Sequence, residues 1–121
     1  MVDPAIVRTV RQYLRAVAAQ GFAVRFGVIF GSCATGSADA WSDIDLLVVS
    51  PDFDGPADRR NVDSLWRLAA RTDSRIEPIP CGERQWREDD SSAIVERARR
   101  EGQRIAIDGE PEVARPRGSG A

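Results

Sequence analysis

The fold of this chain is decided by two neighbouring stretches, FGSCATG at residues 30–36 and SDIDLLVV at residues 42–49. The first stretch ends an alternating strand, expected over residues 24–30, and opens through Gly31-Ser32 into a short helix. The first backbone N–H groups of such a helix have no partner within it, and with the helix dipole they form an anion site. Gly31 lets a phosphate approach the backbone closely, and the Ser32 hydroxyl adds one more donor.

The second stretch predicts a strand over residues 44–49 that is apolar on both faces and therefore central in a sheet. Asp43 and Asp45 lie two residues apart at its start, so both carboxylates share one face, roughly 7 Å apart at the backbone. Side chains that converge from this spacing can hold two metal ions about 3.5–4 Å apart, as in phosphoryl transfer. Their oxygen ligands suit magnesium.

Each of these two pieces also has a purely structural interpretation. Gly-Ser after a strand is commonly just a turn, and Asp-x-Asp at the start of a strand is often a solvated cap. A short motif of either kind is a weak indication when it stands alone. In this order and across this gap, the two pieces together favour a functional site.

Three further patterns predict helices. The first helix starts at Asp3-Pro4, with aspartate as N-cap and proline in the first turn, and ends before Gly21. A second helix spans residues 58–71, and a third, capped by the polar residues 90–92, ends at Gly102. The buried stripe expected on the second helix comprises Val62, Leu65, Trp66 and Ala69.

Two more strands are expected, at residues 75–79 and 104–107. The first of them contains one proline and is followed by another, so it is short or lies near a sheet edge. Strands that alternate with helices indicate an α/β (α+β) fold with one domain over residues 1–108. The Pro/Gly/Arg-rich segment 109–121 has little to bury and is predicted to be a disordered tail.

Composition excludes several classes of protein. The chain has 121 residues with 42% hydrophobic content, which suffices for one core. Its net charge is −2 and all 17 basic residues are arginine, so charge gives no case for nucleic-acid binding. Histidine is absent, and two cysteines, Cys33 and Cys81, cannot form a zinc site. No stretch is long enough to span a bilayer, and a cytoplasmic protein without membrane contact is expected.

The pattern Gly-Ser, a gap, then Asp-hydrophobic-Asp resembles the signature of nucleotidyltransferases of the DNA polymerase β superfamily. The surrounding residues are similar to the minimal, MNT-type bacterial branch, of which kanamycin nucleotidyltransferase is a larger relative. The resemblance implies the nucleotidyltransferase fold, a small mixed sheet with flanking helices. It also implies transfer of a nucleoside monophosphate, with AMP as the first candidate, from ATP or another NTP to a hydroxyl, with two Mg²⁺ ions as cofactors.

The resemblance assigns roles to particular residues. Asp43 and Asp45 would hold the metal ions, and the nucleotide would be bound by Gly31, Ser32 and Gly36. Glu77, in the sequence Ile76-Glu77-Pro78, would be the third carboxylate, both metal ligand and catalytic base; the alternative is a solvent-facing glutamate on an edge strand. Thr35 departs from the pattern, because minimal nucleotidyltransferases typically have arginine at that position.

The resemblance also implies a partner. Minimal nucleotidyltransferases are often paired with a small, all-helical HEPN toxin, which some silence by binding and others by adenylylation. An MNT-type antitoxin that binds a HEPN-like toxin with little or no catalysis is therefore the alternative function. A homodimer stays open. Arg97, Arg99 and Arg100 could form a phosphate patch, but they alternate with glutamates, and a solvated helix face is the favoured interpretation.

Overall fold

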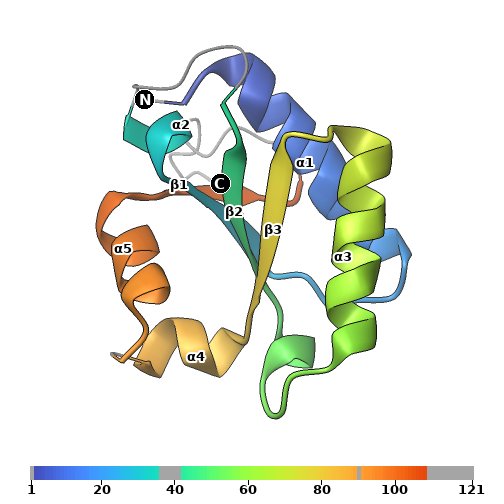
Figure 1. Ribbon diagram of the computed structural model, residues 1–121, viewed down its shortest axis with the longest axis vertical. Coiled ribbons are helices and arrows are strands. Elements are labelled where there is room, and N and C mark those ends of the chain that lie inside the picture. The colour runs from blue at the N-terminus through green and yellow to red at the C-terminus, as the bar shows by residue number, and fades with distance from the viewer. Residues whose placement is uncertain (1, 36–41, 90, 109–121) are drawn as a thin grey trace, which may run out of the picture.

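The computed structural model describes residues 2–35, 42–89 and 91–108, and its centre is one mixed sheet with helices on both faces (Figure 1). The strands are β1 (Phe26–Phe30), β2 (Ile44–Val49), β3 (Ile76–Cys81) and β4 (Gln103–Ala106). Their order across the sheet is β3-β2-β1-β4. Strand β1 pairs antiparallel with β2 and β4, whereas β2 and β3 are parallel. The predicted mixed sheet is confirmed, and β2 is central as its apolar faces indicated.

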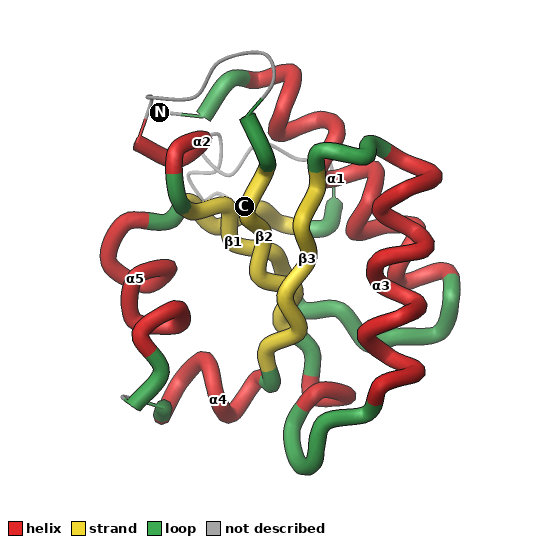
Figure 2. Tube along the Cα trace, viewed as in Figure 1, coloured by secondary structure: helices red, strands yellow, loops and turns green. Residues whose placement is uncertain are grey.

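Helices cover the sheet from two sides. They are α1 (Pro4–Ala19), α2 (Ser32–Thr35), the 3₁₀ turn η1 (Pro51–Phe53), α3 (Arg59–Thr72), α4 (Glu83–Glu88) and α5 (Ala93–Glu101). Helices α1 and α3 lie together on one side of the strands, while α4 and α5 lie on the other (Figure 2). The Tyr13 hydroxyl on α1 donates a hydrogen bond of 2.9 Å to the Leu65 carbonyl on α3, which links α1 to α3.

Alternation along β2 divides the core into two clusters. Ile44, Leu46 and Val48 belong to the larger cluster beneath α1 and α3. Leu47 and Val49 belong to the smaller cluster beneath α5. Because successive side chains of a strand point to opposite faces, Asp45 shares its face with Leu47 and Val49. The face that carries α5 is therefore also the face that carries the acidic residues of β2.

Helix starts follow local sequence except at α4. Asp3 caps α1, Asp58 caps α3 and Ser92 caps α5, each through its side chain. The start of α4 is capped from a distant loop, because the Asp54 carboxylate accepts bonds from the Arg84 and Gln85 amides at 3.1 and 3.3 Å. The sequence patterns did not predict α4, since no capping side chain precedes it.

The edge position predicted for β3 is confirmed, but the strand reaches Cys81 and is longer than expected. The carbonyls of Arg75 and Cys81 accept hydrogen bonds from the Ile44 and Ser50 amides, so the odd-numbered residues face β2. Both prolines of β3 occupy even positions, where the missing N–H would have pointed away from the sheet. An edge strand tolerates proline there.

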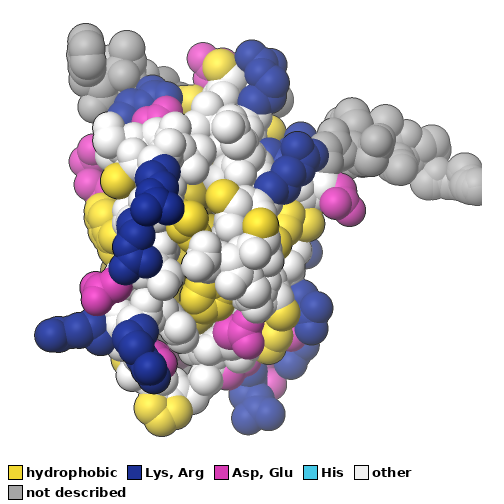
Figure 3. Space-filling view, turned by 90° about the vertical axis from the view of Figure 1, so that its right-hand side faces the viewer, with side chains coloured by type: hydrophobic (Ala, Val, Ile, Leu, Met, Phe, Trp, Pro, Cys, Tyr) yellow, Lys and Arg dark blue, Asp and Glu magenta, His cyan; other side chains and the backbone are white. Residues whose placement is uncertain are grey.

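Two expectations about hydrophobic residues are wrong. The strand expected from residue 24 begins only at Phe26, and Val24 packs on the larger cluster, on the opposite face of the sheet from Phe26. Trp66 is 46% exposed, because Leu65, Leu68 and Ala69 take the buried positions of α3. Around this tryptophan the exposed face of α3 is basic, and Figure 3 shows arginine side chains in dark blue along the α3 side of the molecule. The exposed arginines of α3 are Arg59, Arg60, Arg67 and Arg71.

Candidate active site

Strand pairing places Phe30, Asp45 and Glu77 side by side in one row across the sheet. The next two rows on this face are apolar and consist of Val28, Leu47 and Ile79, then Phe26, Val49 and Cys81. Helix α5 covers the apolar part of this face. The face thus changes from apolar to acidic where β2 begins, and Asp45 and Glu77 stay only half-buried.

Asp43 completes a group of three carboxylates, which we call the carboxylate row. It lies exposed just before β2, two residues from Asp45 and therefore on the same side. Burial, followed by hydrogen bonds and charge from Asp43 and then Asp45, raises the pKa of Glu77. Burial and the charge of Asp43 likewise raise the pKa of Asp45. The structure therefore brings together the three carboxylates that the sequence suggested.

The carboxylates of the row lie close enough together to affect one another's pKa. Within residues 2–35, 42–89 and 91–108, no three His, Cys, Asp or Glu side chains are already gathered around a point that a metal ion could occupy. A cation bound here would require the three carboxylates to converge on it.

The turn at Gly31 lies directly against the carboxylate row. Gly31 has φ of 75°, and a Cβ atom on it would collide with the Asp45 carboxylate. The glycine is therefore required by the backbone and by Asp45, a reason that the sequence did not reveal. The Gly31 carbonyl accepts hydrogen bonds from the Ala34 and Thr35 amides at 3.0 and 3.2 Å, which closes α2. Ser32 opens α2 and is half-buried, while Gly36 lies outside the described residues.

Two side chains of α2 donate hydrogen bonds to backbone carbonyls. The Cys33 thiol donates to the Asp43 carbonyl at 3.5 Å and so links α2 to the start of β2. Burial raises the pKa of Cys33, which keeps it a neutral thiol. The Thr35 hydroxyl lies 3.3 Å from the Gly31 carbonyl, to which it donates.

Positive charge approaches the carboxylate row from two sides. Arg75, beside Cys33, contacts Asp73 at 3.1 and 2.7 Å. Arg97, on α5, exerts a charge that lowers the pKa of Asp45 against the opposite effects of burial and Asp43. The sequence named Arg97 only as one member of a phosphate patch with Arg99 and Arg100, and it favoured a solvated helix face for all three.

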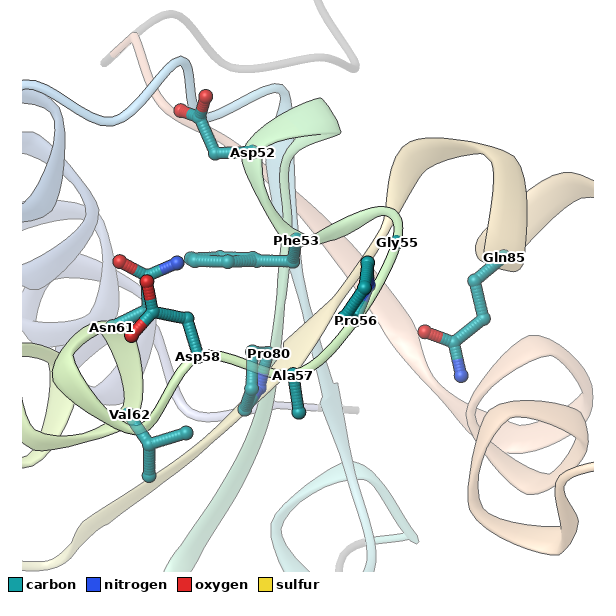
Figure 4. A pocket seen from close by; sticks show the side chains of 10 residues that line it. All are labelled: Asp52, Phe53, Gly55, Pro56, Ala57, Asp58, Asn61, Val62, Pro80 and Gln85. Atoms are coloured by element: carbon teal, nitrogen blue, oxygen red, sulfur yellow. The ribbon is translucent and has the colours of Figure 1, made fainter.

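A separate pocket of about 170 Å³ lies near the other end of β2, around η1 and the start of α3 (Figure 4). Two of its acidic residues have structural partners. Asp52 accepts from the Ala23 amide at 2.7 Å, and Asp58 accepts from the Arg60 amide at 2.9 Å. The pocket contains none of the residues of the carboxylate row.

The comparison with protein families decides the assignment. Residues 10–100 match the nucleotidyltransferase domain family. The chain belongs to this family. The matched segment of the nucleotidyltransferase domain includes the carboxylate row, the Gly31 turn and α2. No functionally curated protein is significantly similar in sequence.

Two solved structures share the fold of this nucleotidyltransferase domain. One is a protein from Sulfolobus solfataricus described as a candidate nucleotidyltransferase, with 23% identity and a TM-score of 0.51 over 69% of this chain and 74% of that one. The other is a toxin–antitoxin with AMP-PNP, with 18% identity and a TM-score of 0.54 over 85% of this chain and 76% of that one. Both support the fold. None of the described helices is long and apolar enough to cross a membrane.

Proposed function

We propose that this nucleotidyltransferase domain transfers a nucleoside monophosphate from a nucleoside triphosphate to a hydroxyl group, with Mg²⁺ as cofactor and AMP as the first candidate. The observation that carries the proposal is the carboxylate row beside the Gly31 turn. Asp43, Asp45 and Glu77 supply the oxygen ligands that Mg²⁺ prefers. Burial and the charges of neighbouring carboxylates raise the pKa values of Asp45 and Glu77, and a cation bound there would favour their ionised forms.

In this proposal, different residues bind the metal ions and the nucleotide. Asp43, Asp45 and Glu77 would hold two Mg²⁺ ions, and Gly31, Ser32 and Gly36 would contact the triphosphate. Ions bound there would neutralise charge on the phosphates and help to ionise the attacking hydroxyl. The protein contributes position and electrostatics, which is sufficient for this kind of transfer and needs no histidine.

In the proposed reaction, the acceptor oxygen attacks the α-phosphorus and forms a new O–P bond. The hydroxyl proton passes to the Glu77 carboxylate, whose raised pKa suits a base. The bond between the α-phosphorus and the oxygen that bridges to the β-phosphate breaks. That oxygen keeps the electron pair and leaves with pyrophosphate.

A protein partner is the proposed source of the hydroxyl. The structural similarity to a toxin–antitoxin with AMP-PNP supports both a triphosphate and a partner protein. We propose a helical, HEPN-like toxin as this partner. The second candidate function is an antitoxin that acts by binding alone, and the absence of a positive charge at Thr35 favours it. A homodimer and a cytoplasmic location stay predictions.

Labelled ATP separates these functions. We would incubate lysate of the source cells with the protein, Mg²⁺ and ATP labelled at either the α- or the γ-phosphate. Nucleotidyl transfer labels an acceptor from the α-phosphate only. Glu77→Gln should keep triphosphate binding but lower turnover by about 10²–10⁴-fold, the range for losing a general base.

The control is Asp63→Asn, an exposed change on α3 that should transfer normally. Label from the γ-phosphate, or unchanged transfer by Asp45→Asn, would contradict the proposal. If Mg-ATP binds and no acceptor is labelled, the binding-only antitoxin becomes the better account. Thr35→Arg is then the first variant to try for restored activity.

A further inference from the structure

Arg97 lies on the helix that shares a sheet face with the carboxylate row. Val95 and Ala98 of α5 are buried in the same cluster as Phe30. Phe30 is the direct neighbour of Asp45 in the pairing of β1 with β2. Arg97 lies between the two buried residues of the helix in sequence, and its own side chain is 51% exposed. The helix therefore presents this arginine to solvent.

The backbone that carries Arg97 is held on both sides. Arg99 donates to the Trp86 and Gln85 carbonyls at 2.7 and 3.0 Å, which ties α5 to α4. Gly102 approaches β1 so closely that a Cβ atom would lie 3.0 Å from the Ile29 carbonyl oxygen. With α5 fixed in this way, a change of partner at Arg97 requires only rotation of its side chain.

Arg97 is two residues from Arg99, so it lies about 200° around the helix from the side that contacts α4. Because α4 follows the far end of β3, the side that carries Arg97 faces toward the row of Asp45 and Glu77.

The ion pair between Arg97 and Glu101 is 3.2 Å long and links positions i and i+4 of an exposed helix. Pairs of this kind are weak. Arg75, the other arginine near the row, is instead held by two contacts to Asp73, with side chains only 33% and 20% exposed. Arg97 is thus the more available cation of the two.

We propose that Arg97 binds the β- and γ-phosphates of the triphosphate and that Glu101 competes for it when no nucleotide is bound. This inference rests on the proposed function and adds a residue to its site. The planar guanidinium pairs with two phosphate oxygens at once. Arginine therefore binds phosphate more strongly than it binds a solvated glutamate. A nucleoside monophosphate lacks the β- and γ-phosphates, so Arg97 should discriminate between ATP and AMP.

The test is calorimetric titration of the whole chain with a non-hydrolysable ATP analogue and with AMP, each with Mg²⁺ at fixed ionic strength. Arg97→Gln should weaken binding of the ATP analogue about tenfold or more, the size expected for one hydrogen-bonded charge pair. AMP binding should change less than about twofold. Glu101→Gln should tighten binding of the analogue about twofold, the size of a weak helix pair. Arg97→Lys should recover part of the affinity, since it keeps the charge without the fork.

The matched control is Arg87→Gln, an exposed arginine of the neighbouring helix α4. It should bind like the wild type. A second readout is titration with Mn²⁺ alone. Removal of the positive charge of Arg97 near Asp45 should leave the affinity for Mn²⁺ equal or higher, whereas the affinity for the ATP analogue should fall. Unchanged ATP affinity in Arg97→Gln would overturn this inference alone. If the wild type binds no triphosphate, the proposed function fails and Arg97 loses its role with it.

Discussion

Burial, foremost, and the charges of the neighbouring carboxylates raise the pKa values of Asp45 and Glu77, so the folded chain disfavours their ionised forms. Asp45→Asn removes one negative charge and keeps the shape of the side chain. We therefore expect the melting temperature of the variant without added metal to equal or exceed that of the wild type. Differential scanning calorimetry measures this directly. A large fall in melting temperature would mean that Asp45 is a structural residue.

Gly31 is constrained twice, by its positive φ and by the Asp45 carboxylate. Gly31→Ala should cost about 1–3 kcal/mol in left-handed backbone strain, with a further cost from displacing Asp45. Gly55→Ala is the matched control, because Gly55 has φ of 91° and no atom lies within 4 Å of the added Cβ. Urea unfolding should show the larger loss for Gly31→Ala. Equal losses of unfolding free energy would show that the Asp45 carboxylate does not obstruct a Cβ atom at position 31.

The pairing of Asp73 with Arg75 predicts how the free energy of unfolding changes at acid pH. The hydrogen bond from the Arg75 side chain, foremost, lowers the pKa of Asp73. The unfolded chain then binds the proton more readily, so the stabilisation is present above the ordinary Asp pKa of about 4 and is lost as pH falls through the lowered value. Asp73→Asn should cost about 1 kcal/mol near neutral pH.

Urea unfolding at several pH values tests this account of Asp73. The difference between wild type and Asp73→Asn should shrink as the pH falls below about 4. A difference that is constant with pH would assign the loss to packing. Asp63→Asn, an exposed change on α3, serves as the control.

At the scale of elements, α4 depends on a loop that is distant in sequence. The Asp54 carboxylate caps it, and Gly82 leaves room for this contact, since a Cβ there would collide with Asp54. Asp54→Ala should cost about 0.5–2 kcal/mol, the range for loss of a helix cap. Gly82→Ala should cost more, because it also forces the loop away. If both variants unfold at the wild-type urea concentration, α4 contributes nothing to the folding unit.

The elements that the sequence predicted correctly are those with local signals. Asp3, Asp58 and Ser92 are adjacent to the helices that they cap, and the apolar run of β2 indicated its central place. Helix α4 was missed because its cap comes from 30 residues earlier in the chain. Trp66 was placed wrongly because helical spacing alone does not show which of two overlapping stripes faces the sheet.

In the candidate site too, some features follow from local sequence and others depend on tertiary packing. The spacing of Asp43 and Asp45 predicted their shared face, because strand periodicity is local. The place of Glu77 beside Asp45 depends on the parallel pairing of β2 with β3, which no local pattern shows and which entered through family resemblance. The contact between Gly31 and Asp45, and the approach of Arg97, depend on tertiary packing and could not be predicted from spacing.

At the scale of the whole molecule, the described core ends near the last strand. Ile105 is buried, and Ile107 packs on the larger cluster. The domain boundary at residue 108 is a prediction from composition. Removal of residues 109–121 should therefore change the melting temperature by less than about 2 °C, below the shift expected from losing 1 kcal/mol. A larger fall would show that the segment contributes to the fold.

The whole-molecule account depends on one face of the sheet, which is covered by α4 and α5 over its apolar rows and acidic where β2 begins. The most direct test is a crystal structure with Mn²⁺ and a non-hydrolysable ATP analogue, with anomalous scattering to locate the metal. We predict a peak about 2–2.2 Å from carboxylate oxygens of Asp43, Asp45 and Glu77, with the triphosphate running from it along the Gly31 turn. A metal peak elsewhere, or a nucleotide in the pocket around η1, would contradict the account.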